Sequence, residues 1–329
     1  MQRRDLLKYL SAGGLALSLP TRNLAGGSKQ IAGGSGFALD DNKLRFFHPG
    51  ISKEFNIMML ADTHLFRDDE RGDPFRQYSG RMAKAYNVTE HYRTGEATNP
   101  EKSFVQALQY AADQKVSQLA IIGDLFSFPS EAAVDWVKEK LTAAGLPFIY
   151  TAGNHDWHYE GLPGSSMQLR NTWINNRLGW MYQQSDPLMH AVEINGVCII
   201  SIDNSTYEIL PEQLRFLKQK LAAGKPTLLM LHIPLYAPGR SLGFGCGHPN
   251  WNAANDKNFE LERRERWPVS GHSETTKNFH AIVLKSGNII GVVAGHTHRQ
   301  SLDLLNGIPQ VVTNANAVGA WLDISFHPA

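Results

Sequence analysis

Cysteine is scarce in this 329-residue chain, which contains only two, Cys198 and Cys246. Two cysteines exclude the disulfide framework that stabilises many small secreted domains, and neither has a second cysteine at the spacing of a zinc–thiolate site. A single bridge between them stays open in an oxidising compartment. Because Cys198 lies in the apolar run 197–200, however, its position favours a packed, reduced thiol.

The chain also lacks an excess of charge and a long hydrophobic run. Its formal net charge is +1, so no strong field is available to hold a polyanion, and we expect no stable nucleic-acid binding. No apolar stretch approaches the roughly 20 residues that cross a bilayer, so we expect no transmembrane segment. With 42% hydrophobic and 19% charged residues, the composition is that of a globular protein.

Residues 1–30 have the pattern of an export signal and linker. Arg3 and Arg4 precede a short apolar stretch at 9–19, and together they resemble a twin-arginine signal, with Leu6 where phenylalanine is more common. The alternative is a chance pair of arginines on an ordinary helix. The resemblance implies recognition by the twin-arginine export machinery, loading of any cofactor before transport, and a periplasmic or extracellular location.

From residue 44 onward, short apolar runs alternate with longer segments of helical periodicity. This alternation predicts an α/β fold. The runs are apolar throughout, which is typical of strands buried on both faces; they lie at 55–61, 119–122, 148–151, 227–231 and 289–294. The segments with amphipathic helical spacing are 100–114, 130–144, 211–222 and 274–285.

Two hairpins and two long insertions complete the organisation. Asn195-Gly196 separates the runs 189–194 and 197–202, and Asn306-Gly307 separates 301–305 from 308–313; both dipeptides favour tight turns between antiparallel strands. These hairpins suggest a second sheet. The first insertion, residues 66–99, and the second insertion, residues 236–271, interrupt the alternation, and we predict that they are surface segments acting as lids or binding loops.

Each of the five buried strands is followed by side chains that can bind metal. They are Asp62 and His64, Asp124, Asn154 and His155, His232, and His296 and His298. Because the carboxyl ends of strands in an open α/β sheet line a common crevice, these groups are expected to converge. Taken singly, each has an ordinary alternative, such as a turn, a helix cap or a core histidine; their joint occurrence at five strand ends favours a metal site.

The order of these motifs resembles the calcineurin-like metallophosphoesterase superfamily. The motifs are Asp-x-His at 62–64, Gly-Asp at 123–124, Gly-Asn-His-Asp at 153–156, His232, and Gly-His-x-His at 295–298, and the match covers about 44–326. The resemblance implies one domain with two facing mixed β-sheets flanked by helices in four layers. It also implies that Asp62, His64 and His298 hold one metal, that Asn154, His232 and His296 hold the other, and that Asp124 bridges them.

The ligand types indicate the chemistry independently of the resemblance. Imidazole, carboxylate and amide ligands together suit Mn, Fe or Zn, and seven ligands exceed the capacity of one site. Two such ions activate a shared water, so we predict hydrolysis of a phosphate ester by a metal-bridging hydroxide. His155 is not needed as a ligand and is predicted to assist the leaving group, with Asp156 orienting its imidazole. The alternative for Asp156 is a helix cap.

Departures from two named branches of the superfamily narrow the expected substrate. Ser127 stands where a purple acid phosphatase carries its iron-binding tyrosine, and the Asp-Arg-Gly of protein Ser/Thr phosphatases is replaced by other residues at 125–129. What remains resembles a bacterial, phosphodiesterase-like branch, with a small phosphodiester or phosphomonoester as substrate. The alternatives are a nuclease or nucleotide pyrophosphatase, and a catalytically silent metal-binding protein. The sequence specifies no oligomeric state.

Overall fold

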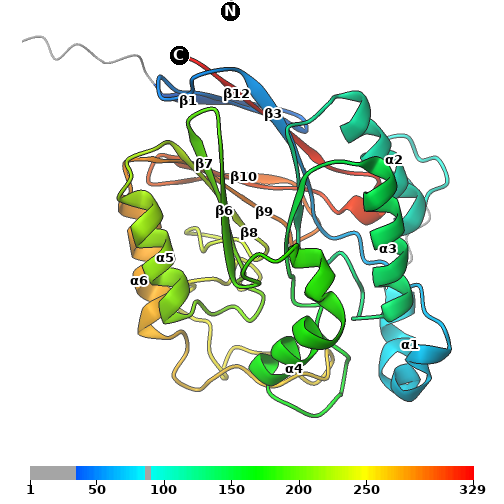
Figure 1. The fold of residues 1–329 in the computed structure, drawn as a ribbon. Helices are drawn as coiled ribbons and strands as arrows, with labels where there is room; N and C mark the ends of the chain where they lie inside the picture. The colour runs from blue at the N-terminus through cyan, green and yellow to red at the C-terminus, as the bar shows by residue number, and fades with distance from the viewer. Residues whose placement is uncertain (1–34, 86–89) are drawn as a thin grey trace, which may run out of the picture. The chain divides into compact units, whose positions relative to one another are not determined.

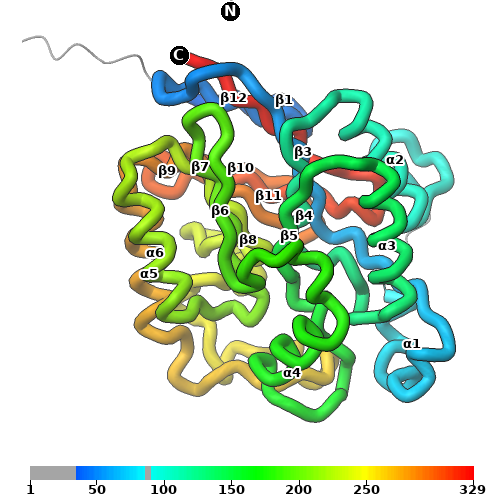
Figure 2. The backbone as a smooth tube through the Cα atoms, in the orientation of Figure 1, coloured from blue at the N-terminus to red at the C-terminus, as the bar shows by residue number. Residues whose placement is uncertain are grey.

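The computed structural model describes residues 35–85 and 90–329. The predicted signal at 1–30 lies outside the described residues. Two six-stranded sheets form the centre of the described part of the chain, and the helices lie on their outer faces (Figure 1). Figure 2 shows how the chain completes its first sheet, because strand β12 near the C-terminus returns to lie between strands β2 and β3.

The first sheet has the strand order β1-β2-β12-β3-β4-β5. Its strands are β1 (Gly36–Asp40), β2 (Lys43–Phe47), β12 (Leu322–His327), β3 (Phe55–Leu60), β4 (Gln118–Ile122) and β5 (Phe148–Thr151). Strands β3, β4 and β5 run parallel, so their carboxyl ends lie at one edge of the sheet. Three of the five predicted catalytic motifs follow these strands.

The second sheet has the order β10-β11-β9-β8-β7-β6. Its strands are β10 (Ser301–Leu305), β11 (Ile308–Val312), β9 (Ile289–Ala294), β8 (Thr227–Leu231), β7 (Val197–Ile202) and β6 (Met189–Ile194). The two predicted hairpins form its edges. Asn195, Gly196, Asn306 and Gly307 all have positive φ, as a type I′ turn requires.

The sheets pack face to face because their strands are apolar on both sides. In β3, Ile57 and Met59 belong to the core between the sheets, whereas Met58 and Leu60 pack toward the helices. A separate core lies between the second sheet and its helices. Each sheet is therefore buried on both faces, and the predicted fold of two mixed sheets flanked by helices is confirmed.

Four helices cover the sheets at the predicted positions. Helices α2 (Pro100–Asp113) and α3 (Glu131–Ala144) pack on the first sheet, and α5 (Pro211–Leu221) and α6 (Glu274–Lys285) on the second. Side chains define their starts: Asn99 accepts a hydrogen bond from the Lys102 amide, and Ser273 accepts one from Thr276. These caps satisfy amide groups that a helix leaves without internal partners.

Several elements were not predicted. Strand β1 begins at Gly36, so the sheet starts before the expected domain boundary at 44. The first insertion is not an irregular loop, because it contains the short helix η1 (Glu70–Phe75) and α1 (Arg76–Ala85). The others are strands β2 and β12 and the helices α4 (Ser166–Trp173), η2 (Ile174–Leu178), η3 (Gly179–Tyr182) and η4 (Asn316–Val318).

The structure also bears on the state of the two cysteines and on membrane-spanning helices. Cys198 and Cys246 are both buried and both free thiols, so the bridge left open by the sequence does not form. Within residues 35–85 and 90–329, no helix has the length and apolar character needed to cross a membrane.

Candidate metal centre

The predicted ligands lie on loops that follow the strands of both sheets, and five of them have left-handed backbone conformations. These residues are Asp62 (φ 58°), His64 (54°), Asp124 (49°), His296 (71°) and His298 (54°). Left-handed conformations are unfavourable for residues with a Cβ. They persist only where surrounding contacts hold the backbone in place, which is common at functional sites. Here they turn the loops sharply, so that side chains from different strands face one another.

The first group of side chains consists of Asp62, His64, Asp124 and His298. Each offers one ligand atom, and these atoms lie within 4.8 Å of one another. The Nε2 atoms of His64 and His298 are 2.9 Å apart, and His298 Nε2 lies 3.4 Å from a carboxylate oxygen of Asp62. Asp62, His64 and Asp124 are almost completely buried. Such a compact set of carboxylates and imidazoles could hold a divalent cation.

The second group consists of Asp124, His232 and His296, whose ligand atoms also lie within 4.8 Å of one another. His232 Nε2 is 3.1 Å from Asp124 Oδ2, and its Nδ1 is 3.0 Å from the carbonyl oxygen of Ile122. The carbonyl can only accept, so Nδ1 carries the proton and Nε2 is left to face the group. Asp124 belongs to both groups, which is the position expected of a bridging ligand.

Asn154 also faces this region. Its side chain lines the same cavity as Asp124, His296 and His298, and its amide oxygen is buried without a hydrogen-bond partner among the described residues. An unpaired buried carbonyl oxygen is costly unless another group satisfies it. A cation bound beside Asn154 would do so, and the residues present therefore fit the predicted metal site.

The charges of the centre favour the metal-binding states of two of its side chains, Asp124 and His296, whereas Asp124 raises the pKa of His232 to about 10 against the effect of burial. Burial alone would raise the pKa of Asp124, but the nearby imidazoles of His232, His155 and His64 hold it well below its usual range. Burial, together with the charge of His232, lowers the pKa of His296 to about 3. Asp124 is thus a carboxylate and His296 a neutral imidazole at neutral pH, as metal ligation requires.

The loops that carry Asp62 and His296 are tied directly to each other. Both carboxylate oxygens of Asp62 accept hydrogen bonds from the His296 amide, at 3.0 and 2.9 Å. Gly295 permits this approach, since a Cβ there would lie 2.6 Å from Asp62 Oδ2. Ser127, the residue at the tyrosine position of the purple acid phosphatase pattern, donates a hydrogen bond from Oγ to the His64 carbonyl at 2.9 Å.

His155 and Asp156 lie at the centre. The His155 ring makes an edge contact with His64, with centroids 5.0 Å apart, so it adjoins the first group. Asp156 was predicted to orient His155. Its two carboxylate oxygens accept hydrogen bonds from the amides of Phe126 (2.7 Å) and Gly153 (2.8 Å), so it joins two loops, and the orienting role stays a prediction. It caps none of the described helices.

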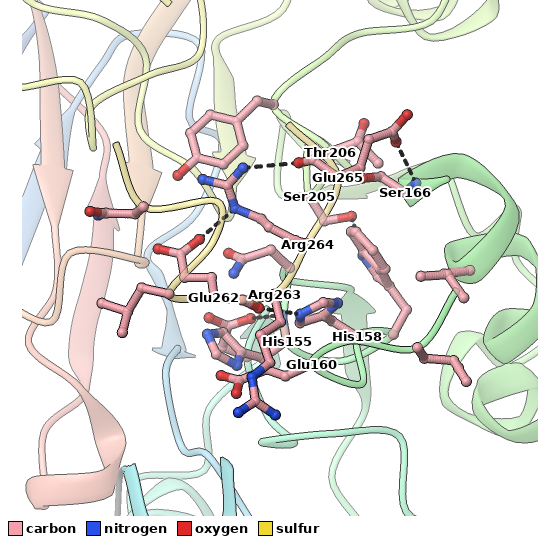
Figure 3. Close-up of a pocket in the computed structure, with 18 of the residues that line it drawn as sticks. His155, His158, Glu160, Ser166, Ser205, Thr206, Glu262, Arg263, Arg264 and Glu265 are labelled. Atoms are coloured by element: carbon pink, nitrogen blue, oxygen red, sulfur yellow. Dashed lines mark hydrogen bonds and ion pairs between the residues drawn. The ribbon is translucent and has the colours of Figure 1, made fainter. Parts of the chain in front are cut away.

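A cavity of about 690 Å³ opens onto the centre. Asp124, Asn154, His155, His296 and His298 line it at one side, and the segments 157–169 and 258–267 form much of its wall. The latter belongs to the second insertion, which passes beside α4 (Figure 1). Figure 3 shows side chains of this insertion, including Glu262 and Arg264, facing the same space as His155 and His158.

Hydrogen bonds hold this wall in place. Arg81 of α1 contacts both carboxylate oxygens of Glu160 at 2.6 Å and donates to the carbonyl oxygen of Leu261 at 2.8 Å. The Gly161 amide donates to the Arg263 carbonyl at 2.8 Å. The two insertions therefore meet beside the cavity, as expected of segments that surround a binding site.

Tyr207 is a residue of this region that the sequence did not single out. Its hydroxyl oxygen lies 2.7 Å from Nε2 of His296, and its ring lines the cavity. Burial raises the pKa of Tyr207 well above its ordinary value, so it is a neutral phenol at neutral pH. The available signal was the polar run 203–207 directly after strand β7, which parallels the other strand-end motifs.

Comparisons with known proteins bear on this arrangement. The family model described as calcineurin-like phosphoesterase matches residues 55–300, and no curated protein matches the chain. A dimetal phosphatase from Danio rerio has a similar structure, with a TM-score of 0.51 and 12% identity over 82% of this chain and 91% of that one. At this identity the similarity extends to the fold alone.

Two further solved structures are more distant. A purple acid phosphatase from yellow lupin has a TM-score of 0.46 and 13% identity, covering 84% of this chain but only 46% of its own length. A calcineurin-like phosphoesterase from Bacillus subtilis has a TM-score of 0.40 and 13% identity, covering 80% of this chain and 82% of that one.

Proposed function

The chain belongs to the calcineurin-like phosphoesterase family, and on this premise we propose that it is a dinuclear metal-dependent hydrolase of a small phosphate ester. One observation carries the proposal: two groups of potential ligands share Asp124 beside a single cavity. Such an arrangement suits two cations held a few ångströms apart, as two-metal phosphoesterases require.

The ligands divide between the two cations as follows. Asp62, His64 and His298 would hold one, Asn154, His232 and His296 the other, and Asp124 both. The donor set of imidazole, carboxylate and amide oxygen suits Mn, Fe or Zn. When bound, the cations would supply Lewis acidity, generating a hydroxide nucleophile at neutral pH and neutralising charge on the phosphoryl oxygens.

Of the remaining side chains, His155 would act on the substrate itself. His155 lines the cavity, contacts the ligand His64 through its ring, and is not required as a ligand. It is therefore placed to give a proton to the leaving oxygen or to neutralise charge that develops there. Asp156 supports this role indirectly, because it fixes the loop that carries Asn154 and His155.

The cavity supports a small ester as substrate and, between the two kinds, a diester. Its volume of about 690 Å³ is within the range of small-molecule sites and leaves room for a substituent on each side of the phosphorus atom. Its lining includes three arginines but also three glutamates, so it lacks the positive field of a groove that binds a polyanion. This balance weighs against the nuclease alternative.

The experiment is a panel of phosphomonoesters, phosphodiesters and cyclic nucleotides, assayed with protein reconstituted with Mn, Fe or Zn. Asp124→Asn should abolish turnover because it removes the shared ligand. Asp323→Asn is the control, since Asp323 lies on strand β12 and its side chain accepts a hydrogen bond from Tyr110 of α2, away from the centre. Equal turnover by the Asp124→Asn and control proteins would reject the two-metal proposal.

We further infer that the protein is exported by the twin-arginine pathway to the periplasm or beyond. The support is the sequence of residues 1–30, with Arg3 and Arg4 ahead of a short apolar stretch. Replacing both arginines with lysine should leave the protein in the cytoplasmic fraction of an expressing bacterium. Unchanged export of that variant would reject the inference.

A further inference from the structure

Tyr207 lies between the candidate metal centre and the aromatic residues of the second insertion. Its hydroxyl oxygen is 2.7 Å from His296 Nε2. Its ring stacks on Trp251, with centroids 5.8 Å apart, and lies 5.6 Å from Trp267. Trp251 and Trp267 in turn stack on each other at 5.0 Å. The insertion therefore holds this tyrosine against a potential metal ligand.

The backbone at Tyr207 is held in an unfavourable conformation. Its φ of 64° is left-handed, which is rare and unfavourable for a bulky residue. The Tyr207 amide donates to the Asn204 carbonyl at 2.8 Å, closing the turn. Gly245 of the insertion makes room for the ring, since a Cβ there would lie 2.7 Å from Tyr207 Cε1. Several elements thus maintain this position of the hydroxyl.

The contact decides which nitrogen of His296 can bind a cation. A ligand nitrogen needs a cation about 2.0–2.1 Å away along its lone pair. The phenol oxygen already occupies that space at Nε2, which leaves Nδ1 as the ligand atom. A ligand nitrogen carries no proton, so the single proton of the neutral imidazole must be on Nε2. His296 then donates this hydrogen bond, and the Tyr207 oxygen accepts it.

In the same assignment, the hydroxyl hydrogen of Tyr207 does not take part in the hydrogen bond with His296. A phenol both donates and accepts, and at neutral pH it keeps its hydrogen. Because Tyr207 lines the cavity beside Asp124, His155 and His296, a substrate in the cavity is within reach of this donor. A phosphoryl oxygen is a strong, charged acceptor, and hydrogen bonds to charged groups are worth more than those between neutral ones.

We propose that Tyr207 is a positioning residue for His296, fixing its metal-binding tautomer, and that its hydroxyl also donates a hydrogen bond to a phosphoryl oxygen of the substrate. The second part rests on the proposed function; the first requires only that the centre binds metal. In this arrangement the second insertion contributes to the metal centre through the aromatic stack that holds Tyr207 in place.

The positioning role is tested with Tyr207→Phe, which removes the hydroxyl and keeps the ring that packs on Trp251. Metal affinity is measured by chelator competition on the metal-loaded protein. We expect one of the two ions to bind about 10- to 100-fold more weakly. Tyr110→Phe is the matched control, because it removes a hydroxyl that bonds Asp323 at 3.0 Å, away from the centre. Equal affinities in both variants would overturn the positioning role.

The substrate contact is tested at saturating metal, where the weaker site is filled in both proteins. There, kcat/KM of Tyr207→Phe should be about 10- to 100-fold lower than that of Tyr110→Phe, the cost of one hydrogen bond to a charged group. Equal kcat/KM would overturn the substrate contact. If the wild-type protein hydrolyses no ester, the proposed function fails, while the affinity measurement still decides the positioning role.

Discussion

The substitution Gly153→Ala tests how tightly the centre is built. Gly153 begins the Gly-Asn-His-Asp motif, and a Cβ on it would lie 2.2 Å from Asp124 Oδ1 and 2.3 Å from the Asp124 amide nitrogen. Real Cβ contacts essentially never fall below 3.0 Å, so one loop must move by about 0.8 Å. Its φ is not positive, so the added methyl group acts through contact and not through backbone strain.

The size of the effect follows from these distances. Inserting a methyl group into a packed site costs about 1–3 kcal/mol, so the unfolding free energy should fall by that amount. Metal–ligand distances tolerate only about 0.2 Å, which is far less than the required shift of Asp124. A displacement of nearly 1 Å at a reacting site lowers the rate about 100-fold. We therefore expect a folded protein with little bound metal and about 100-fold lower kcat/KM.

The assay combines metal content, thermal unfolding and phosphodiester turnover. Gly287→Ala is the control, because a Cβ at Gly287 has no neighbour within 4 Å and its φ is not positive. It should retain metal and activity. Wild-type metal content and turnover in Gly153→Ala would refute the argument, since the two loops would then tolerate a shift that the ligand geometry forbids.

Three further predictions concern the wall, pH and metal. Arg81→Ala, compared with Arg81→Lys, should raise KM about fivefold with little change in kcat. The substitution removes the contacts to Glu160 and Leu261 that hold the cavity wall, which costs about 1 kcal/mol of binding free energy. A reduced kcat at unchanged KM would contradict this. Burial, followed by the charge of His155, lowers the pKa of His158 to about 4 from 6.5. As pH falls, His158 therefore gains its proton in the unfolded state before it does so in the folded state. Between pH 7 and 4, the unfolding free energy of the wild type should fall by about 3 kcal/mol relative to that of His158→Gln, measured by urea unfolding. Parallel plots of unfolding free energy against pH for the two proteins would contradict this. Chelation should lower Tm by about 10 °C, since a ligand at 1,000 times its Kd contributes about 4 kcal/mol; an unchanged Tm would mean that no ion stabilises the fold.

The central strands were predictable because burial on both faces leaves a continuous apolar run. Strands β5, β8 and β9 begin and end at the predicted residues. Strand β12 alternates between buried and half-buried positions and pairs with strands more than 260 residues earlier, so its neighbours are not apparent from local sequence. Helix α4 has little apolar bias, although its capping box of Ser165 and Gln168 was a usable signal.

The convergence of the candidate ligands was predictable for a related reason: polar residues that directly follow an apolar strand have no packing role. The structure gathers Asp62, His64, Asp124, His232, His296 and His298 into the two groups described above. The supporting contacts were not predictable in the same way. Asp156 bonds two backbone amides, and Tyr207 meets His296 across the two loops, and both contacts depend on how the loops fold in space.

Anomalous X-ray scattering from crystals of the metal-loaded protein is the sharpest test of the dinuclear centre. We expect two anomalous peaks a few ångströms apart, one among Asp62, His64 and His298, the other among Asn154, His232 and His296, with the Asp124 carboxylate between them. A single peak, or peaks elsewhere on the molecule in fully active protein, would contradict it.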